Sequence, residues 1–167
     1  EKLSLEAANL ALANQQPLQA EALLKQALRY HPDALDAWLL LGQTYERLKL
    51  FTEALGCYEQ VVDLRPPSLA DRRRLVDLYL RTGQPAKALG QVQTALRVRP
   101  RDRELLLILG DCQMALKNPA AAAAAYEQAA DLAPRQPEYR LKLAEALAAA
   151  GDGAAALTEY RKVCDLA

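Results

Sequence analysis

The sequence has few of the residues on which enzyme chemistry usually depends. It contains one histidine, His31, which directly precedes a proline, and its serines are Ser4 and Ser68. It has no Gly-rich phosphate loop and no His/Cys cluster with the spacing of a zinc site. A lone histidine beside a proline is more typical of a solvated linker than of a general base. We therefore predict a protein that is not an enzyme and that uses neither a cofactor nor a metal.

Cysteine is also sparse. The three cysteines are Cys57, Cys112 and Cys164, and no two of them form a C-x-x-C pair. An odd number without metal-ligand spacing predicts free thiols.

Neither sign of charge dominates, and no long apolar run is present. Lys+Arg and Asp+Glu number 21 each, so the formal net charge is zero. A neutral chain has no overall attraction to nucleic acid or to an anionic membrane surface. No apolar run approaches the ~18–20 residues that span a bilayer, so direct membrane insertion is not expected.

The N-terminus has no signal-peptide pattern, and its first residue is Glu1 rather than Met. We expect a piece of a longer protein, and its localisation stays open between cytoplasm and periplasm.

One stretch, residues 35–66, shows the organising pattern of the chain. Its first half contains the spacing W-x2-L-G-x2-Y, formed by Trp38, Leu41, Gly42 and Tyr45. Its second half contains A-x3-aromatic followed by a closing proline, formed by Ala54, Tyr58 and Pro66. This stretch resembles one unit of a tetratricopeptide repeat, a 34-residue helix–turn–helix module.

The same pattern recurs in register along the whole chain. Steps of 34 residues give the units 1–34, 35–68, 69–102, 103–136 and 137–167. One small residue stands at the same place in every unit: Ala20, Ala54, Ala88, Ala122 and Ala156. A closing proline recurs as Pro32, Pro66, Pro100 and Pro134. The resemblance implies a single all-α domain over residues 1–167, a right-handed superhelical solenoid of ten helices.

Turn and cap residues mark the ends of the predicted helices. Turn dipeptides inside the units lie at residues 14–17, 83–85, 118–119 and 151–153. In the second unit residues 48–51 contain neither Gly nor Pro, and register alone predicts the turn there. The residues predicted to cap first helices are Asp33, Ser68 and Asp102.

The resemblance further implies a concave face, lined by the first helix of each unit, on which peptide ligands lie. A stripe turned away from the packing face of those helices predicts the partner-binding residues. They are Leu5, Asn9, Leu39, Gln43, Glu46, Arg73, Asp77, Leu107, Asp111, Met114, Leu141 and Glu145. An apolar row lies beside a row that becomes acidic toward the C-terminus. The predicted partner is a protein or peptide with apolar and basic residues, and no small-molecule substrate or nucleic acid is expected. In a second interpretation the leucines fill gaps between neighbouring first helices.

A basic cluster around the third unit offers another surface, formed by Arg72, Arg74, Arg97, Arg99 and Arg101. These arginines either make a solvated edge or bind an acidic partner or a nucleic acid. No aromatic residues are interleaved with them for base stacking.

The resemblance implies a protein–protein interaction scaffold. A composition rich in Ala, Leu and Arg resembles bacterial modules of envelope-assembly, secretion or polysaccharide-export complexes. The alternative is a regulatory or substrate-recruiting module of a larger enzyme. Nucleic-acid binding through the arginine cluster is a third hypothesis, and self-association through the C-terminal end is a further one.

Overall fold

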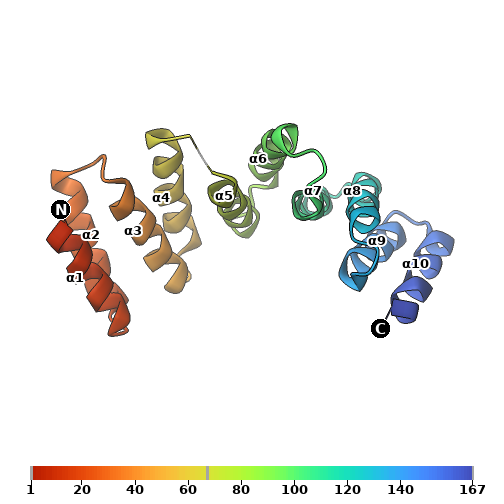
Figure 1. The fold of residues 1–167 in the computed structure, drawn as a ribbon, viewed down its shortest axis with the longest axis horizontal. Helices are drawn as coiled ribbons and strands as arrows, with labels where there is room; N and C mark the ends of the chain where they lie inside the picture. Colours follow the sequence, from red (N-terminus) through yellow and green to blue (C-terminus); the bar gives the residue numbers. More distant parts are fainter. Residues whose placement is uncertain (1, 67, 167) are drawn as a thin grey trace. The chain divides into compact units, whose positions relative to one another are not determined.

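The computed structural model describes residues 2–66 and 68–166, and the secondary structure within those ranges is entirely helical (Figure 1). Ten helices follow one another: α1 (Lys2–Ala13), α2 (Pro17–Tyr30), α3 (Leu35–Arg47), α4 (Phe51–Leu64), α5 (Leu69–Arg81), α6 (Pro85–Val98), α7 (Arg103–Ala115), α8 (Pro119–Leu132), α9 (Pro137–Ala149) and α10 (Gly153–Leu166). The prediction of an all-α chain with two helices per repeat is confirmed.

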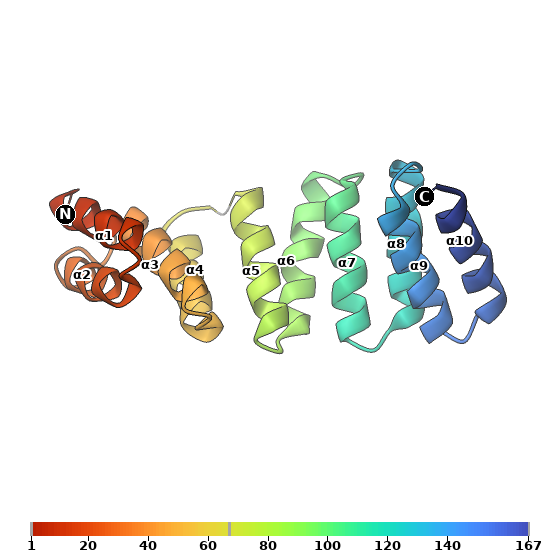
Figure 2. The same cartoon turned by 90° about the horizontal axis from the view of Figure 1, so that it is seen from below.

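The helices belong to two compact units, Glu1–Thr82 with α1 to α5 and Gly83–Ala167 with α6 to α10. In the first unit each helix packs on the next one along the chain, from α1 through α5. The second unit repeats this arrangement from α6 through α10. Figure 2 shows the same succession within each unit, with helices such as α1 and α2 or α9 and α10 side by side.

The repeated alanine of each second helix is buried, as expected for a residue at a close helix crossing. Its exposed fraction is 3% in α10 and 0% in the other four second helices, at Ala20, Ala54, Ala88, Ala122 and Ala156. Protein interiors are packed so tightly that a larger side chain at such a position displaces its neighbours. The small residue therefore sets how closely the two helices of a repeat approach.

Glycines on two first helices make room for a tyrosine ring of the same repeat. A Cβ atom at Gly42 would lie 2.9 Å from Cζ of Tyr58, and one at Gly110 would overlap the ring of Tyr126. Both rings are buried, with exposed fractions of 1% and 2%. In these two repeats a missing side chain on the first helix compensates for a large one on the second.

All five turns inside the repeats place the same repeat position in the left-handed region. The values of φ are 60° at Gln15, 60° at Lys49, 72° at Gly83, 59° at Lys117 and 90° at Gly151. After α7 the N–H of Asn118 donates to the Gln113 carbonyl (2.9 Å) and that of Lys117 to the Met114 carbonyl (2.9 Å). This pair of bonds is a Schellman motif. The turn predicted at residues 48–51 is confirmed, and Lys49 adopts there the conformation that glycine adopts in the third and fifth repeats.

Two of the three predicted caps are confirmed. Ser68 and Asp71 form a capping box at α5, and Oδ1 of Asp102 accepts from the Glu104 and Leu105 N–H groups (3.1 Å each). The prediction for Asp33 is wrong. Because α3 begins at Leu35, its N-cap is Ala34, which has no side-chain acceptor, and Asp33 lies one residue too early.

The contact between Gly110 and Tyr126 leads to a stability prediction. We expect Gly110→Ala to lower the free energy of unfolding by about 1–3 kcal/mol, because the new methyl group overlaps a buried ring. Adding Tyr126→Leu should recover part of the loss, since it recreates the Ala8 and Leu24 combination found at the same positions of the first repeat. Urea unfolding of the single and double variants measures this.

Gly90→Ala is the matched control, because a Cβ there meets nothing within 4 Å. It should be neutral or stabilise by about 0.5–1 kcal/mol, as alanine does in a helix interior. Equal effects of alanine at the two glycines would contradict the packing argument.

The turn geometry leads to a second prediction, at Lys117. A non-glycine residue in the left-handed region destabilises the folded state by about 1–2 kcal/mol. Glycine avoids this strain but loses more backbone entropy on folding, which costs about 0.5–1 kcal/mol. Lys117→Gly should therefore raise stability by up to about 1 kcal/mol, and Gly151→Ala should lower it by a similar amount. Thermal unfolding of both variants tests the pair, and changes of the same sign would refute the argument.

Candidate functional site

In the first unit the predicted stripe combines exposed polar groups with half-buried leucines. Asn9 on α1, Gln43 on α3 and Asp77 on α5 are exposed. Leu5 on α1 and Leu39 on α3 are half-buried, as are the remaining stripe residues of this unit, Glu46 and Arg73. The first helices of this unit thus carry apolar side chains that are only partly covered, beside polar groups that reach water.

In the second unit apolar members of the predicted stripe take part in packing. Leu107 on α7 packs against two buried clusters, and Met114 packs against one of them. On α9 Leu141 is 40% exposed and Glu145 is exposed. Leu107 therefore fills a gap in the packing and still keeps part of its surface accessible.

Glu46 lies at the centre of a polar cluster that spans three consecutive helices. The hydroxyl of Tyr58 on α4 donates to Oε2 of Glu46 on α3 (3.2 Å), and Nε of Arg74 on α5 lies 3.6 Å from Oε1. The Arg74 guanidinium also lies over the Tyr58 ring, 5.3 Å from its centroid. Burial, together with the Glu46 carboxylate, raises the pKa of Tyr58, so its hydroxyl stays a donor at physiological pH.

Asp111 has the same role in the second unit. The hydroxyl of Tyr126 on α8 donates to Oδ1 of Asp111 on α7 (2.7 Å), and Nζ of Lys142 on α9 donates to the same oxygen (3.1 Å). Burial is the main cause that raises the pKa of Tyr126, and the hydrogen bond to Asp111 adds to it. Each cluster thus joins a buried tyrosine, an acid and a base from three successive helices.

These two clusters change the electrostatics of the stripe. A basic ligand group would have to compete with Arg74 at Glu46 and with Lys142 at Asp111. Asp77 pairs with Arg81 (2.7 Å), but both side chains are more than half exposed, and such surface pairs contribute little. Asp77 and Glu145 are therefore the exposed acids of the stripe, whereas Glu46 and Asp111 are engaged in the two clusters.

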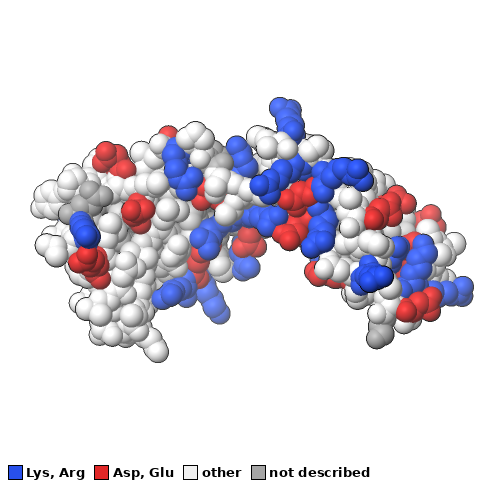
Figure 3. All heavy atoms as spheres, in the orientation of Figure 1, with Lys and Arg blue, Asp and Glu red and all other residues white. Residues whose placement is uncertain are grey.

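The arginine cluster is divided between the two units. Arg72 and Arg74 lie on α5 of the first unit, and Arg74 takes part in the Glu46 cluster. The other three belong to the second unit, where they are exposed: Arg97, Arg99 and Arg101. Arg99 lies 4.0 Å from Asp102. On the face drawn in Figure 3 acidic side chains lie among the basic ones in both units.

The last repeat contains a largely buried ion pair. Nη1 of Arg140 on α9 donates to Oε2 of Glu159 on α10 (3.1 Å), and Nζ of Lys162 donates to Oε1 (2.6 Å). The side chains of Glu159 and Arg140 are only 12% and 18% exposed. Burial acts to raise the pKa of Glu159, but the bonds from Lys162 and Arg140 outweigh it and hold that pKa below 4.5.

Apolar side chains at the two ends of the helix series are exposed where their counterparts are buried. Leu157 on α10 is 60% exposed, whereas Leu55 and Ala123 at the same repeat position are 4% and 7% exposed. On α1, Leu3 and Leu10 are 81% and 64% exposed. Both end helices thus offer apolar surface for contact.

Of the groups that could support catalysis, Ser4 and His31 line one surface cavity of the first unit. All three cysteines are free: Cys57 and Cys112 are buried, and Cys164 is exposed. Burial raises the pKa of Cys57 to about 12 and that of Cys112 to about 11, so neither is a thiolate at neutral pH. His31 is exposed at the end of α2. Across residues 2–66 and 68–166 no three His, Cys, Asp or Glu side chains are placed to hold a metal ion, and no helix is long and apolar enough to cross a membrane.

Comparisons with known proteins agree with this helical repeat architecture. A family model described as "Tetratricopeptide repeat" matches residues 5–68, 73–137 and 114–167. The TPR repeat-containing protein MJ0941 of Methanocaldococcus jannaschii is 38% identical over 60 residues, which cover 36% of this chain. The match spans 18% of that relative, less than a fifth of its length.

Solved structures of similar fold cover nearly the whole chain. MamA from Desulfovibrio magneticus RS-1 has a TM-score of 0.83 at 22% identity, over 99% of this chain and 93% of that chain. YrrB, described as a TPR protein with an unusual peptide-binding site, has a TM-score of 0.81 at 20% identity, over 98% and 84% of the two chains. At these identities the likeness shows the fold.

The Glu159 ion pair predicts a pH-dependent stability. A carboxyl whose pKa is lower in the folded than in the unfolded state stabilises the fold above its unfolded value, near 4.5, and loses that contribution as pH falls through the lower folded value. Glu159→Gln should cost about 1–2 kcal/mol at neutral pH, and the difference from wild type should shrink in acid. Thermal unfolding from neutral pH to below 4 measures it, with the exposed Glu127→Gln as control. A difference that does not change with pH would contradict the assignment.

Proposed function

The chain belongs to the tetratricopeptide repeat family, and we propose that it binds an extended or helical segment of a partner protein along the first helices of its repeats. The family and the fold make it a protein–protein interaction scaffold in general terms. YrrB, which has the same fold, is described as having a peptide-binding site, and this supports a peptide-like ligand here.

The observation that carries the proposal is the composition of the stripe. Leu5, Leu39 and Leu141 present partly covered apolar surface, with exposed polar groups such as Asn9 and Gln43 beside them. Interfaces bind through apolar groups at their centre, and polar groups around them fix the orientation. A ligand segment with apolar side chains at helical or extended spacing would cover the leucines, each of which contributes up to about 1.5–3 kcal/mol when fully buried.

The charges of the stripe favour basic residues between the apolar ones. Glu145 and Asp77 are exposed, and Arg81 is the exposed partner of Asp77. A ligand lysine or arginine can replace that surface pair at small cost, while Glu46 and Asp111 stay with their internal partners. Acidic rims of this kind act mainly on selectivity and on the rate of encounter.

We place this binding in a bacterial complex for envelope assembly, secretion or polysaccharide export, on the basis of the Ala-, Leu- and Arg-rich composition. The alternative is a regulatory or substrate-recruiting module of a larger enzyme. Self-association through α10 is a second candidate, which the 60% exposure of Leu157 favours.

Two synthetic peptides test the stripe directly. One pairs leucines with lysines at helical spacing, and the other replaces each lysine with glutamate. Fluorescence anisotropy should show tighter binding of the lysine peptide, and Asp77→Lys with Glu145→Lys should weaken it by about fivefold for each pair lost. Asp111 is left unchanged because it belongs to the Tyr126 cluster.

The matched control neutralises the exposed arginines of the second unit with Arg97→Gln, Arg99→Gln and Arg101→Gln. Binding of the lysine peptide should be unchanged or slightly tighter in this variant. If the wild-type protein instead binds the glutamate peptide more tightly, and only the arginine variant loses this preference, the stripe is not the binding surface. That result would support the arginine cluster. Circular dichroism of every variant confirms that helical content is retained.

A further inference from the structure

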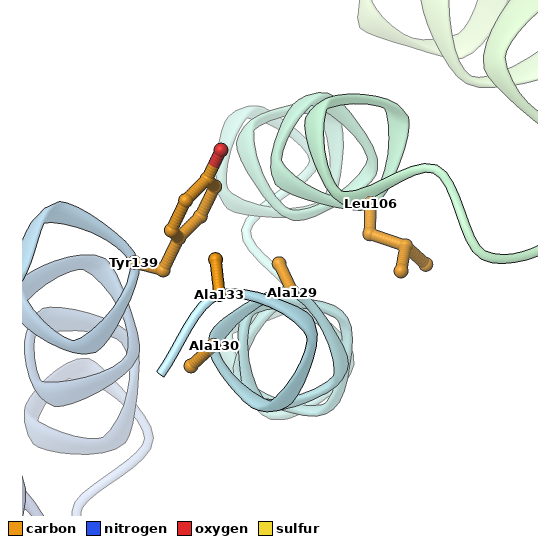
Figure 4. Close-up of a cluster of buried hydrophobic side chains, with 5 residues drawn as sticks. All are labelled: Leu106, Ala129, Ala130, Ala133 and Tyr139. Carbon is orange, nitrogen blue, oxygen red and sulfur yellow. The ribbon is translucent and has the colours of Figure 1, made fainter. Parts of the chain in front are cut away.

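A surface cavity lies beside the first turn of α7 and the last turns of α8. Its volume is about 230 Å³, and it is lined by Pro100, Arg101, Leu106, Gln128, Asp131 and Leu132. Figure 4 shows Leu106 extending from α7 beside Ala129 of α8, while Tyr139 of α9 lies on the other side of Ala133. All these elements belong to the second unit, and the cavity uses no residue of the first-helix stripe.

Four of the six lining residues recur at the corresponding positions around the second repeat. The residues that correspond to Pro100, Gln128, Asp131 and Leu132 are a proline, a glutamine, an aspartate and a leucine at the same repeat positions: Pro32, Gln60, Asp63 and Leu64. Two lining positions differ: the second repeat has Trp38 at the position of Leu106, and Asp33 stands at the position of Arg101.

In the second repeat, the Trp38 side chain stands at the position that Leu106 has in the fourth repeat. Its indole ring is half-buried, and its Nε1–H donates to the carbonyl oxygen of Pro32 (2.8 Å). Leu106 is buried, with an exposed fraction of 3%, but leucine has neither a planar ring nor an N–H donor. The fourth repeat therefore keeps four of these residues and has a leucine in place of the indole.

We propose that this cavity binds the indole side chain of a tryptophan from a partner protein. Leu106 and Leu132 provide apolar surface for the ring, and Pro100, which also lines the cavity, has the repeat position of Pro32, whose carbonyl accepts from the Trp38 indole. Arg101, which is exposed at the edge of the cavity, adds a cation that can lie over an aromatic face. Buried tryptophans that also donate a hydrogen bond are frequent anchors of protein interfaces.

A second cavity, in the first repeat, provides the comparison. It has a volume of about 190 Å³ and is lined by Ser4, Gln26, Ala27, Tyr30 and His31. Ser4 stands at the same repeat position as Trp38 and Leu106, and Gln26 corresponds to Gln60, but Tyr30 stands where the second repeat has Leu64. The match of lining residues singles out the cavity of the fourth repeat.

The test uses the full chain with two probes, indole and N-acetyltryptophanamide, monitored through the NMR signals of the leucine methyl groups. Both probes should shift the methyl signals of Leu106 and Leu132. Leu106→Trp should fill the cavity from within, abolish the shifts at Leu132 and raise the Tm. Ser4→Trp, the matched control in the first repeat, should leave the shifts unchanged.

Leu132→Ser provides a second variant that removes apolar surface from the cavity, and it should weaken binding of both probes several-fold. Absence of shifts with both probes, or shifts at Leu132 that persist in Leu106→Trp, would overturn the site. Binding of indole without N-acetyltryptophanamide would overturn the assignment to a partner's side chain. None of these results depends on peptide binding at the first-helix stripe, so this proposal and the proposed function fail independently.

Discussion

The close approach of the two helices in each repeat is the constraint on which the rest of the structure depends. It requires a small residue at one position of every second helix, and the five alanines there are buried. On the facing first helix, Gly42 and Gly110 leave room for the rings of Tyr58 and Tyr126. Their hydroxyls then reach acids of the first helix and, through them, a base of the next repeat. Local packing within one repeat thus determines which polar contacts join it to the next.

The junctions between repeats are consequently of two kinds. Where the second helix presents a tyrosine, the next first helix presents a base at a fixed position, as in Tyr58 with Arg74 and Tyr126 with Lys142. Where it presents Leu24 or Val92, that position is aliphatic: Leu40 and Ile108. A buried hydroxyl needs a hydrogen-bond partner, and a partly buried carboxylate needs a counter-charge, so introducing a tyrosine requires both other groups. An aliphatic residue at the same place requires only shape complementarity.

The sequence was sufficient to predict the fold because the pattern is repeated. The helices, the buried alanines and even the turn at Lys49, which lacks glycine and proline, follow from register. The candidate site could be predicted only as a stripe of positions on single helices. Arg74 was assigned to a basic patch because its partner Glu46 lies on another helix, and the acid–base contact of Asp111 with Lys142 was missed for the same reason. The constant spacing from tyrosine to base in two repeats was a signal that could have revealed both clusters.

The acids of the stripe therefore differ in physical role although they look alike in the sequence. Glu46 and Asp111 complete the contacts between repeats, and their charge is already compensated by the protein itself. Glu145 and Asp77 reach solvent, where a charge costs little to maintain and is easily engaged by a ligand. Exchange of an internal acid disturbs the packing between repeats, whereas in the proposed binding mode exchange of an exposed acid alters recognition alone. A comparison between equivalent repeat positions is also the basis of the proposal for the cavity at Leu106. The second repeat has a tryptophan, Trp38, at the position where the fourth repeat has this leucine.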